Sequence, residues 1–285
     1  MLSALEKSTK RDVQSEPFPY LVVEDALPQN IADELLATYP SLNLLGGGVQ
    51  GLVKNGIVPN NEKLRYYSFE VLKDHNIPDI WKDFVKTHLS YDFYKIFFHL
   101  FEDEIARFYP NLLPNLKSFT PKDIGMRKFD SFDDKKMLLD AEICVDTPVK
   151  FTSSVKPAHI DGMRKLAVML YYLKKPDDDS VGGDFEISSL EKGPLVLNQD
   201  RIVQSGQLKK ENIIPYRHNT ALIFLNTKDS LHGVSPRQPT NHLRYSFDVA
   251  FELPNALFDL TPNICVPITT RVRRKLGKIA RSILK

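Results

Sequence analysis

The chain has 285 residues and is almost balanced in charge, with a formal net charge of +2 at pH 7. A chain of this length can bury a substantial core as one large domain or two small ones. The near balance of charge argues against a dedicated nucleic-acid-binding surface. Cys144 and Cys265 are the two cysteines, too few for a disulfide framework or a structural zinc site.

Hydropathy along the chain favours a cytoplasmic protein. Residues 1–15 lack the apolar run of a secretion signal, and no stretch of eighteen consecutive apolar residues occurs. We therefore expect neither export nor a transmembrane segment.

Residues 29–110 predict a helical layer. Residues 31–39 form a short amphipathic segment that ends at Pro40, and Ser90 is a suitable N-cap for a longer helix. The apolar residues of that longer segment recur at helical spacing and should face the core: Phe93, Ile96, Phe97, Leu100, Phe101, Ile105 and Phe108. Residues 42–51 include three consecutive glycines and predict a mobile loop; no Gly-Lys-Ser/Thr follows, which argues against phosphate binding.

From about residue 141, short apolar segments alternate with Pro and Gly, a pattern typical of all-β structure. The expected strands cover residues 141–147, 165–174, 183–188, 219–226 and 243–253. This arrangement favours a double-stranded β-helix, the jelly-roll barrel of the cupins. We predict an α+β fold with a mainly β core and a helical N-terminal layer, in a single domain over residues 1–253. Residues 254–285 would then be a C-terminal extension.

Two histidines and one aspartate form a candidate metal site. His159 and Asp161 are two residues apart, so in an extended segment they point to the same side. His232 follows soon after the apolar run of residues 220–225. An isolated His-x-Asp pair usually lies in a turn or caps a helix, but the surrounding strand pattern favours a metal site. Two imidazoles and one carboxylate on one face of a metal leave positions open, as in non-haem Fe(II) oxygenases.

The alternation of residues 243–253 places Arg244, Ser246 and Asp248 on one strand face. A guanidinium offers a planar fork of donors that matches a carboxylate. Arg244 together with the Ser246 hydroxyl is therefore predicted to bind the far carboxylate of a dicarboxylic acid. Tyr172 carries a hydroxyl at the end of an apolar strand face and is either a candidate site residue or a core aromatic residue. Asp248 is expected to pair with a neighbouring cation.

These motifs resemble the catalytic core of the 2-oxoglutarate/Fe(II)-dependent oxygenases, in the prolyl 4-hydroxylase-like branch. The matching stretches are residues 159–161, 166–173, 182–187, 232–236 and 244–247, and residues 16–28 resemble the first strand and helix entry of that branch. The spacing from the second histidine to the arginine is longer than in many members, with the extra residues in the polar turn at 237–241.

The resemblance implies a mechanism and a set of cofactors. His159, Asp161 and His232 would bind Fe(II), which 2-oxoglutarate would chelate while Arg244 holds its other end. Similar tyrosines in this branch hydrogen-bond that distal carboxylate, which gives Tyr172 its candidate role. O2 would be the second cosubstrate, the products would be succinate, CO2 and a hydroxylated substrate, and ascorbate is a further candidate cofactor.

The substrate stays open at this stage. A small molecule such as an amino acid, a sugar or another metabolite is favoured over a prolyl residue in a protein, and a non-catalytic iron/2-oxoglutarate sensor is the alternative class. Selectivity is expected in variable loops at residues 46–61 and 189–214. A nucleic-acid demethylase is disfavoured, because Ala250 stands where that branch has a second arginine.

Other conspicuous residues have simpler explanations. Asp177 to Asp179 follow Pro176 and should form a solvated turn. Residues 269–285 carry seven cations and no acid, with apolar residues at helical spacing, and predict a basic helix that packs on the protein itself; an anionic membrane surface or an acidic partner is the alternative. Five histidines are expected to have surface or packing roles: His75, His88, His99, His218 and His242. Among these, His242 has the best claim to a position at the pocket rim.

Overall fold

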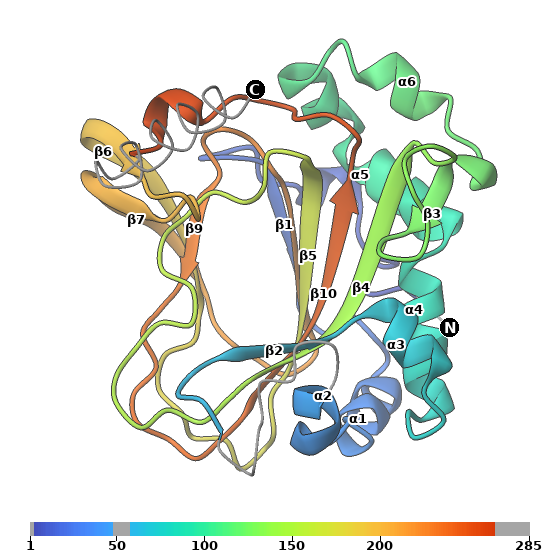
Figure 1. Cartoon of the computed structure of the whole chain (residues 1–285), viewed down its shortest axis with the longest axis vertical. Coiled ribbons are helices and arrows are strands. Elements are labelled where there is room, and N and C mark those ends of the chain that lie inside the picture. Colours follow the sequence, from blue (N-terminus) through green and yellow to red (C-terminus); the bar gives the residue numbers. More distant parts are fainter. Residues whose placement is uncertain (1–2, 48–57, 266–285) are drawn as a thin grey trace, which may run out of the picture.

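The computed structural model describes residues 3–47 and 58–265, which form two facing β-sheets with helices on the outer side of the larger sheet (Figure 1). The larger sheet has the strand order β1, β8, β5, β10, β4, β2, with β3 beside β4. Its strands are β1 (Tyr20–Val23), β8 (Thr220–Leu225), β5 (Lys165–Leu173), β10 (Arg244–Glu252), β4 (Met137–Asp146), β2 (Lys63–Tyr66) and β3 (Ile124–Met126). Apart from the parallel pair of β3 and β4, the neighbours run antiparallel.

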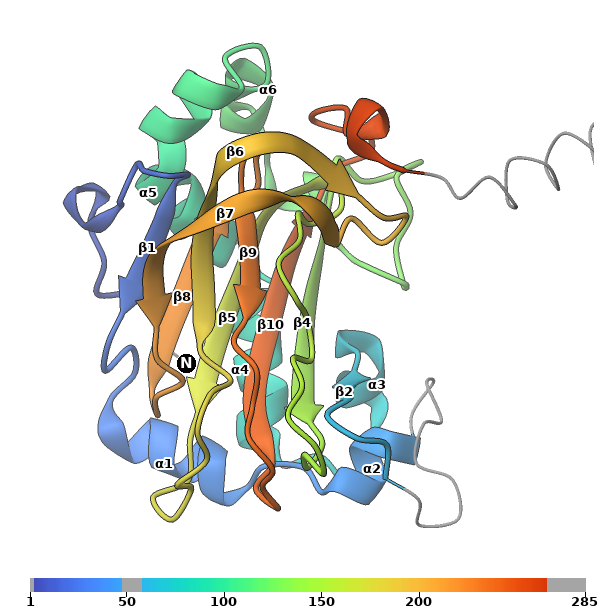
Figure 2. The same cartoon turned by 90° about the vertical axis from the view of Figure 1, so that its left-hand side faces the viewer.

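The smaller sheet has the order β7, β6, β9 and lies in front of the larger one (Figure 2). Its strands are β6 (Phe185–Leu197), β7 (Val203–Ile214) and β9 (Leu231–Val234). The expected α+β organisation with a mainly β second half is confirmed, while the complete double-stranded β-helix stays a prediction.

The α-helices all lie in the first half of the described chain. They are α1 (Gln29–Ala37), α2 (Leu42–Gly47), α3 (Ser68–Lys73), α4 (Asp79–His88), α5 (Tyr91–Phe108) and α6 (Leu113–Lys117). Three short 3-10 turns accompany them: Lys10–Asp12, Pro121–Asp123 and Thr261–Asn263. As predicted, Ser90 caps α5 by accepting a hydrogen bond from the amide of Phe93 at 3.1 Å.

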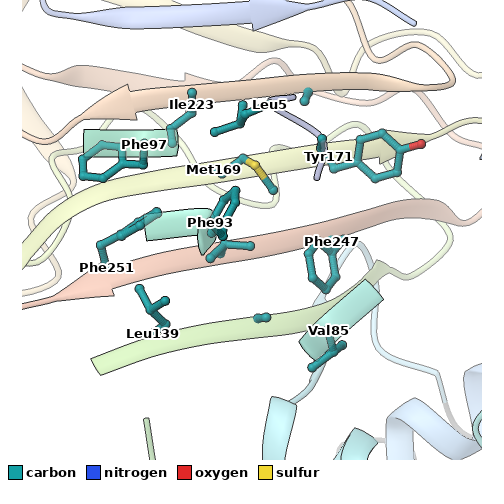
Figure 3. Packing of buried hydrophobic residues seen from close by; sticks show 14 of the residues in the cluster. Leu5, Val85, Phe93, Phe97, Leu139, Met169, Tyr171, Ile223, Phe247 and Phe251 are labelled. Atoms are coloured by element: carbon teal, nitrogen blue, oxygen red, sulfur yellow. The ribbon is translucent and has the colours of Figure 1, made fainter. Parts of the chain in front are cut away.

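The main core lies between the helices and the outer face of the larger sheet (Figure 3). The apolar stripe of α5 meets alternate residues of β10: Phe93 and Phe97 pack on Phe251, with ring centroids 5.6 and 4.4 Å apart. The remaining residues of β5 and β10 face the smaller sheet, because side chains alternate along a strand. The helices therefore stabilise one face of the sheet and leave the other free to build a site.

His88 belongs to this core. It is completely buried, its Nδ1 lies 2.8 Å from the carbonyl of Phe84, and its Nε2 accepts a hydrogen bond from the amide of Ala4 at 3.2 Å. Burial lowers the pKa of His88 to about 4, so the ring is neutral near pH 7. The packing role expected from the sequence fits this position.

Three predictions about the organisation of the chain need correction. Residues 42–47 form α2 and not a loop, because Leu45 is buried against the core. The run of helices over 29–110 is interrupted by β2, which pairs with β4. Residues 189–214 belong largely to β6 and β7, whose side chains are mostly exposed and polar, so that no apolar alternation marked them as strands. Residues 48–57 and the basic segment 269–285 lie outside the described residues.

The packing of α5 on the sheet predicts a large difference between two identical substitutions. Phe251→Ala should lower the free energy of unfolding by about 3–5 kcal/mol, because it opens a cavity in the aromatic core. Phe151 is 65% exposed, so Phe151→Ala should change stability by less than about 0.5 kcal/mol. Urea denaturation of both variants measures the difference, and equal losses would contradict this account of the core.

Candidate metal centre

The three predicted metal ligands converge at the inner face of the fold. His159 and Asp161 lie in the segment before β5, and His232 lies in β9. An antiparallel bridge joins the two histidines, since the amide of His159 donates to the carbonyl of His232 at 2.8 Å and the reverse bond measures 3.1 Å. One ligand atom from each of the three side chains lies within 4.8 Å of the others.

Hydrogen bonds orient both imidazoles. Nδ1 of His159 lies 2.9 Å from the carbonyl of Pro157, and Nδ1 of His232 lies 2.8 Å from the carbonyl of Ser230. A carbonyl only accepts, so each Nδ1 carries the proton and each Nε2 keeps a free lone pair. Those Nε2 atoms lie 3.9 and 3.7 Å from the carboxylate oxygens of Asp161. This is the tautomer in which metal-binding histidines are usually held.

The protonation states also suit a cation. Burial lowers the pKa of both His159 and His232, so the rings are neutral near pH 7. Burial alone would raise the pKa of Asp161, but the ammonium of Lys165 at 3.2 Å holds it below its ordinary value. The trio therefore offers two lone pairs and one negative charge without first losing a proton.

Aromatic contacts fix the second histidine. Phe185 stacks on the ring of His232 with centroids 5.2 Å apart, and Phe224 lies 4.5 Å from it. These rings belong to a small apolar cluster between the two sheets. They keep water from one side of the imidazole and limit its rotation.

The trio opens into a cavity of about 230 Å³ between the sheets. Its apolar wall is formed by Val155, Val168, Leu170, Phe185, Phe224 and Val234. Its charged lining consists of Lys63, Arg65, Lys156, Asp161, Lys165, Arg201, Arg244 and Asp248. A larger cavity of about 540 Å³ lies around the end of α5 and residues 253–257, and none of the three ligand residues lines it.

Arg244 also lines this cavity, but its charge already has a partner. It lies directly opposite Asp146 in the pairing of β10 with β4, and its Nη1 is 2.9 Å from Oδ2 of that residue. Its Nε donates to the carbonyl of Gly183 at 2.9 Å. Gly183 has a φ of 85° and a Cβ there would come within 3.2 Å of the arginine side chain, so glycine suits this close approach.

Tyr172 lies next to the arginine and lines the same cavity. The guanidinium of Arg244 lies 4.7 Å from the centre of its ring. Its hydroxyl is buried and has no hydrogen-bond partner among residues 3–47 and 58–265. Buried hydroxyls nearly always have a partner, so an unpaired one beside an arginine indicates a place for a ligand oxygen.

The Ser246 hydroxyl is placed differently from what the sequence suggested. Its hydroxyl donates to Oδ1 of Asp248 at 2.9 Å, and its side chain does not line the cavity. Asp248 in turn is 2.9 Å from the ammonium of Lys63, the pairing with a cation that the sequence suggested. Of the predicted pair, Arg244 lines the cavity together with Tyr172, whereas Ser246 does not.

Sequence reasoning missed most of the cavity's cations: Lys63, Arg65, Lys156, Lys165 and Arg201. One weak signal was available, since Lys63 and Arg65 are two residues apart and share a strand face. The others lie in irregular segments or at a strand end, where spacing in the sequence does not predict direction.

The remaining candidates lie away from the cavity lining. Nε2 of His242 is 3.4 Å from Asp179, and Nε2 of His218 is 3.1 Å from Asp33. The acidic turn at 177–179 is only partly solvated, because Asp178 is buried and accepts a hydrogen bond from the amide of Ser180. Within the described residues, the group of side chains that could hold a metal ion consists of His159, Asp161 and His232.

Comparison with known proteins gives structural neighbours only. No family model and no curated protein matches the sequence. A prolyl-4-hydroxylase from Pseudomonas putida is 10% identical with a TM-score of 0.43, over 83% of this chain and 93% of that one. Prolyl 4-hydroxylases from Phytophthora capsici are 13% identical with a TM-score of 0.44, over 92% of this chain and 68% of that one. The dioxygenase for auxin oxidation 1 from Arabidopsis thaliana, in a complex with 2-oxoglutarate, is 15% identical with a TM-score of 0.36, over 83% of this chain and 84% of that one.

The three proteins compared above are at most 15% identical to this chain. Their identities and TM-scores are too low to assign a function, which therefore has to rest on the geometry of the site. None of the helices in the described part of the chain is long and apolar enough to cross a membrane.

Proposed function

We propose that the protein is an Fe(II)- and 2-oxoglutarate-dependent dioxygenase built on a double-stranded β-helix within one domain over residues 1–253. The observation that carries this proposal is the convergence of His159, His232 and Asp161, with both Nε2 atoms free, at a cavity that also holds Arg244. Three ligands of these types on one side of a metal leave room for a bidentate cosubstrate and for O2.

Different residues of the chain would have different roles at this site. The carbonyls of Pro157 and Ser230 hold the imidazoles in the metal-binding tautomer, and Lys165 keeps Asp161 ionised. Ferrous iron held there supplies the oxygen chemistry that couples conversion of 2-oxoglutarate to succinate and CO2 with hydroxylation of a C–H bond. The apolar wall excludes water from this reaction.

The far carboxylate of 2-oxoglutarate would bind between Tyr172 and Arg244. The tyrosine hydroxyl has no partner among the described residues, and the arginine uses its Nε and Nη1 in the contacts described above. Asp146 holds the guanidinium in place, so the clamp is ordered before the cosubstrate binds. Charge-assisted hydrogen bonds of this kind are stronger than those between neutral groups.

A small-molecule substrate agrees best with the size of the cavity. At about 230 Å³ it lies below the usual range for ligand pockets, which favours a compact substrate over a folded protein segment. A non-catalytic sensor would bind the same iron and 2-oxoglutarate, and formation of succinate under O2 separates the two functions.

Removal of the carboxylate tests the metal site. Asp161→Ala should weaken Fe(II) binding by more than the about 10- to 100-fold that is typical when a group that only orients a metal ligand is lost. Succinate formation should fall to background. Anaerobic iron titration measures the first effect and product analysis the second.

Asp177, an exposed acid away from the cavity, supplies the matched control, because Asp177→Ala removes the same charge. Iron affinity of Asp161→Ala equal to that of the control would mean that this carboxylate is not a ligand.

The cosubstrate clamp is tested by removing one oxygen atom. Tyr172→Phe should weaken 2-oxoglutarate binding by about 1.5–3 kcal/mol, the range for a hydrogen bond to a charged group. Its stability should hardly change, since the hydroxyl has no partner among the residues the structure describes. Iron affinity should stay at the level of the unmodified protein. Calorimetric titration with 2-oxoglutarate gives the affinities.

Tyr216→Phe is the matched control, because this ring also lies over Arg244 but its hydroxyl already donates to the carbonyl of Leu173 at 2.9 Å. That variant should lose stability and keep its affinity for 2-oxoglutarate. If Tyr172→Phe binds 2-oxoglutarate as tightly as the parent protein, the tyrosine hydroxyl does not bind the cosubstrate.

A further inference from the structure

The charges around the metal cavity are not balanced by the residues that line it. Six cations line the cavity together with two carboxylates, Asp161 and Asp248. Four of the six have an acidic partner at 3.2 Å or less: Lys63 with Asp248, Arg65 with Glu142, Lys165 with Asp161 and Arg244 with Asp146. The other two are Lys156 and Arg201.

Lys156 and Arg201 have no carboxylate partner among the described residues. The ammonium of Lys156 takes part in no ion pair there, and the guanidinium of Arg201 donates through Nε to the carbonyl of Ile160 at 3.2 Å. Burial lowers the pKa of Lys156, and the like charge of Arg201 contributes in the same direction against the opposing effect of Asp161. Both residues line the same cavity, where burial and like charges disfavour the charged form of Lys156, a cost that an anion would offset.

The backbone holds Arg201 at this place. It lies in the turn between β6 and β7 with a φ of 63°, a conformation that costs free energy for any residue other than glycine. The side chain of Asn198 accepts hydrogen bonds from the amides of Asp200 and Ile202, both at 2.9 Å, and the carbonyl of Arg201 accepts from the amide of Ile160 at 3.2 Å. The turn is therefore tied to the strand segment that carries the metal ligands.

The two unpaired cations lie on the wall opposite the clamp proposed for 2-oxoglutarate. Arg244 and Tyr172 belong to β10 and β5 of the larger sheet. Lys156 lies in the segment that bonds to β9, where its carbonyl accepts from the amide of Val234 at 2.8 Å, and Arg201 follows β6. Figure 1 shows β6 and β9 across the fold from β10.

Loading the site with its proposed cofactors does not supply the missing anion. Ferrous iron and 2-oxoglutarate carry opposite charges of equal size, so together they leave the balance of the cavity unchanged. One carboxylate of 2-oxoglutarate would be at the metal and the other at the clamp. The positive charges of Lys156 and Arg201 then remain for a second ligand.

We propose that the substrate oxidised at this site is an anion, and that its carboxylate or phosphate group binds to Lys156 and Arg201. The inference rests on the proposed function and narrows it, because neutral sugars and neutral peptide segments are excluded as substrates. An arginine and a lysine together provide a directional fork and a compact point charge, a combination suited to oxyanions.

Sulfate tests the site without knowledge of the substrate, because it is a dianion that does not precipitate ferrous iron. The full chain is loaded anaerobically with Fe(II) and saturating 2-oxoglutarate and titrated with sulfate by calorimetry. We expect saturable binding, weakened at least about tenfold in the double variant Lys156→Gln/Arg201→Gln. Competition with acetate and with methyl phosphate then shows whether a carboxylate or a phosphate is preferred.

Two variants make the result specific. Arg11 and Lys150 are exposed and away from the cavity, so Arg11→Gln/Lys150→Gln loses the same two charges and should bind sulfate like the parent. Lys156→Arg keeps the charge and should retain most of the binding even if the double variant folds poorly. Absence of saturable sulfate binding, or equal binding in the cavity and control double variants, would overturn the inference.

Binding of 2-oxoglutarate distinguishes failure of this inference from failure of the proposed function. If Lys156→Gln/Arg201→Gln weakens 2-oxoglutarate as much as it weakens sulfate, these cations serve the cosubstrate and the inference is wrong while the proposed function stands. If the parent binds neither Fe(II) nor 2-oxoglutarate, the proposed function fails and the inference fails with it.

Discussion

The pair of backbone hydrogen bonds between His159 and His232 is the constraint on which the site depends. It joins an irregular segment before β5 to β9 of the smaller sheet, and so brings together side chains from distant parts of the sequence. Because Asp161 lies two residues after His159, the same bridge also positions the carboxylate. The helices on the outer face of the larger sheet contribute indirectly, since they free its inner face for the cavity.

Rows of charged residues across the larger sheet complete the cavity. The strand register places Lys63, Asp146 and Arg244 side by side on β2, β4 and β10. Each buried charge there needs a partner, because the desolvation of an isolated ion costs several kcal/mol. The pairing of Arg244 with Asp146 holds the guanidinium in a fixed position, and the Tyr172 hydroxyl beside it has no hydrogen-bond partner in the described part of the chain.

The sequence predicted those features that depend on local periodicity. The strands that carry Tyr172 and Arg244, the cap at Ser90 and the aromatic stripe of α5 all follow from spacing along the chain. The His-x-Asp pair and the second histidine could be predicted as candidate ligands because an open ferrous site requires a recognisable set of residue types, and the fold brings their side chains together. The direction of the Ser246 hydroxyl could not be predicted, since it depends on which acceptor lies nearest in three dimensions.

Contacts that depend on pairing between strands distant in the sequence could not be predicted either, because they too are set by neighbours in three dimensions. The partner of Arg244 lies on another strand, and Arg201 reaches the cavity through a hairpin whose exposed, polar strands carry no apolar alternation. The unbalanced charge of the cavity is a property of the folded chain, because three of its six cations are paired with acids far away in the sequence, while Lys165 pairs with Asp161 four residues earlier. A list of charged residues alone would not separate the paired cations from the unpaired ones.

The most direct test of the account is a crystal structure of the protein grown anaerobically with Fe(II), with the metal located by anomalous scattering at the iron edge. The account predicts one iron bound by Nε2 of His159, Nε2 of His232 and the carboxylate of Asp161, with its other positions facing the cavity. Iron at another place, or a metal enclosed by protein ligands on all sides, would contradict it.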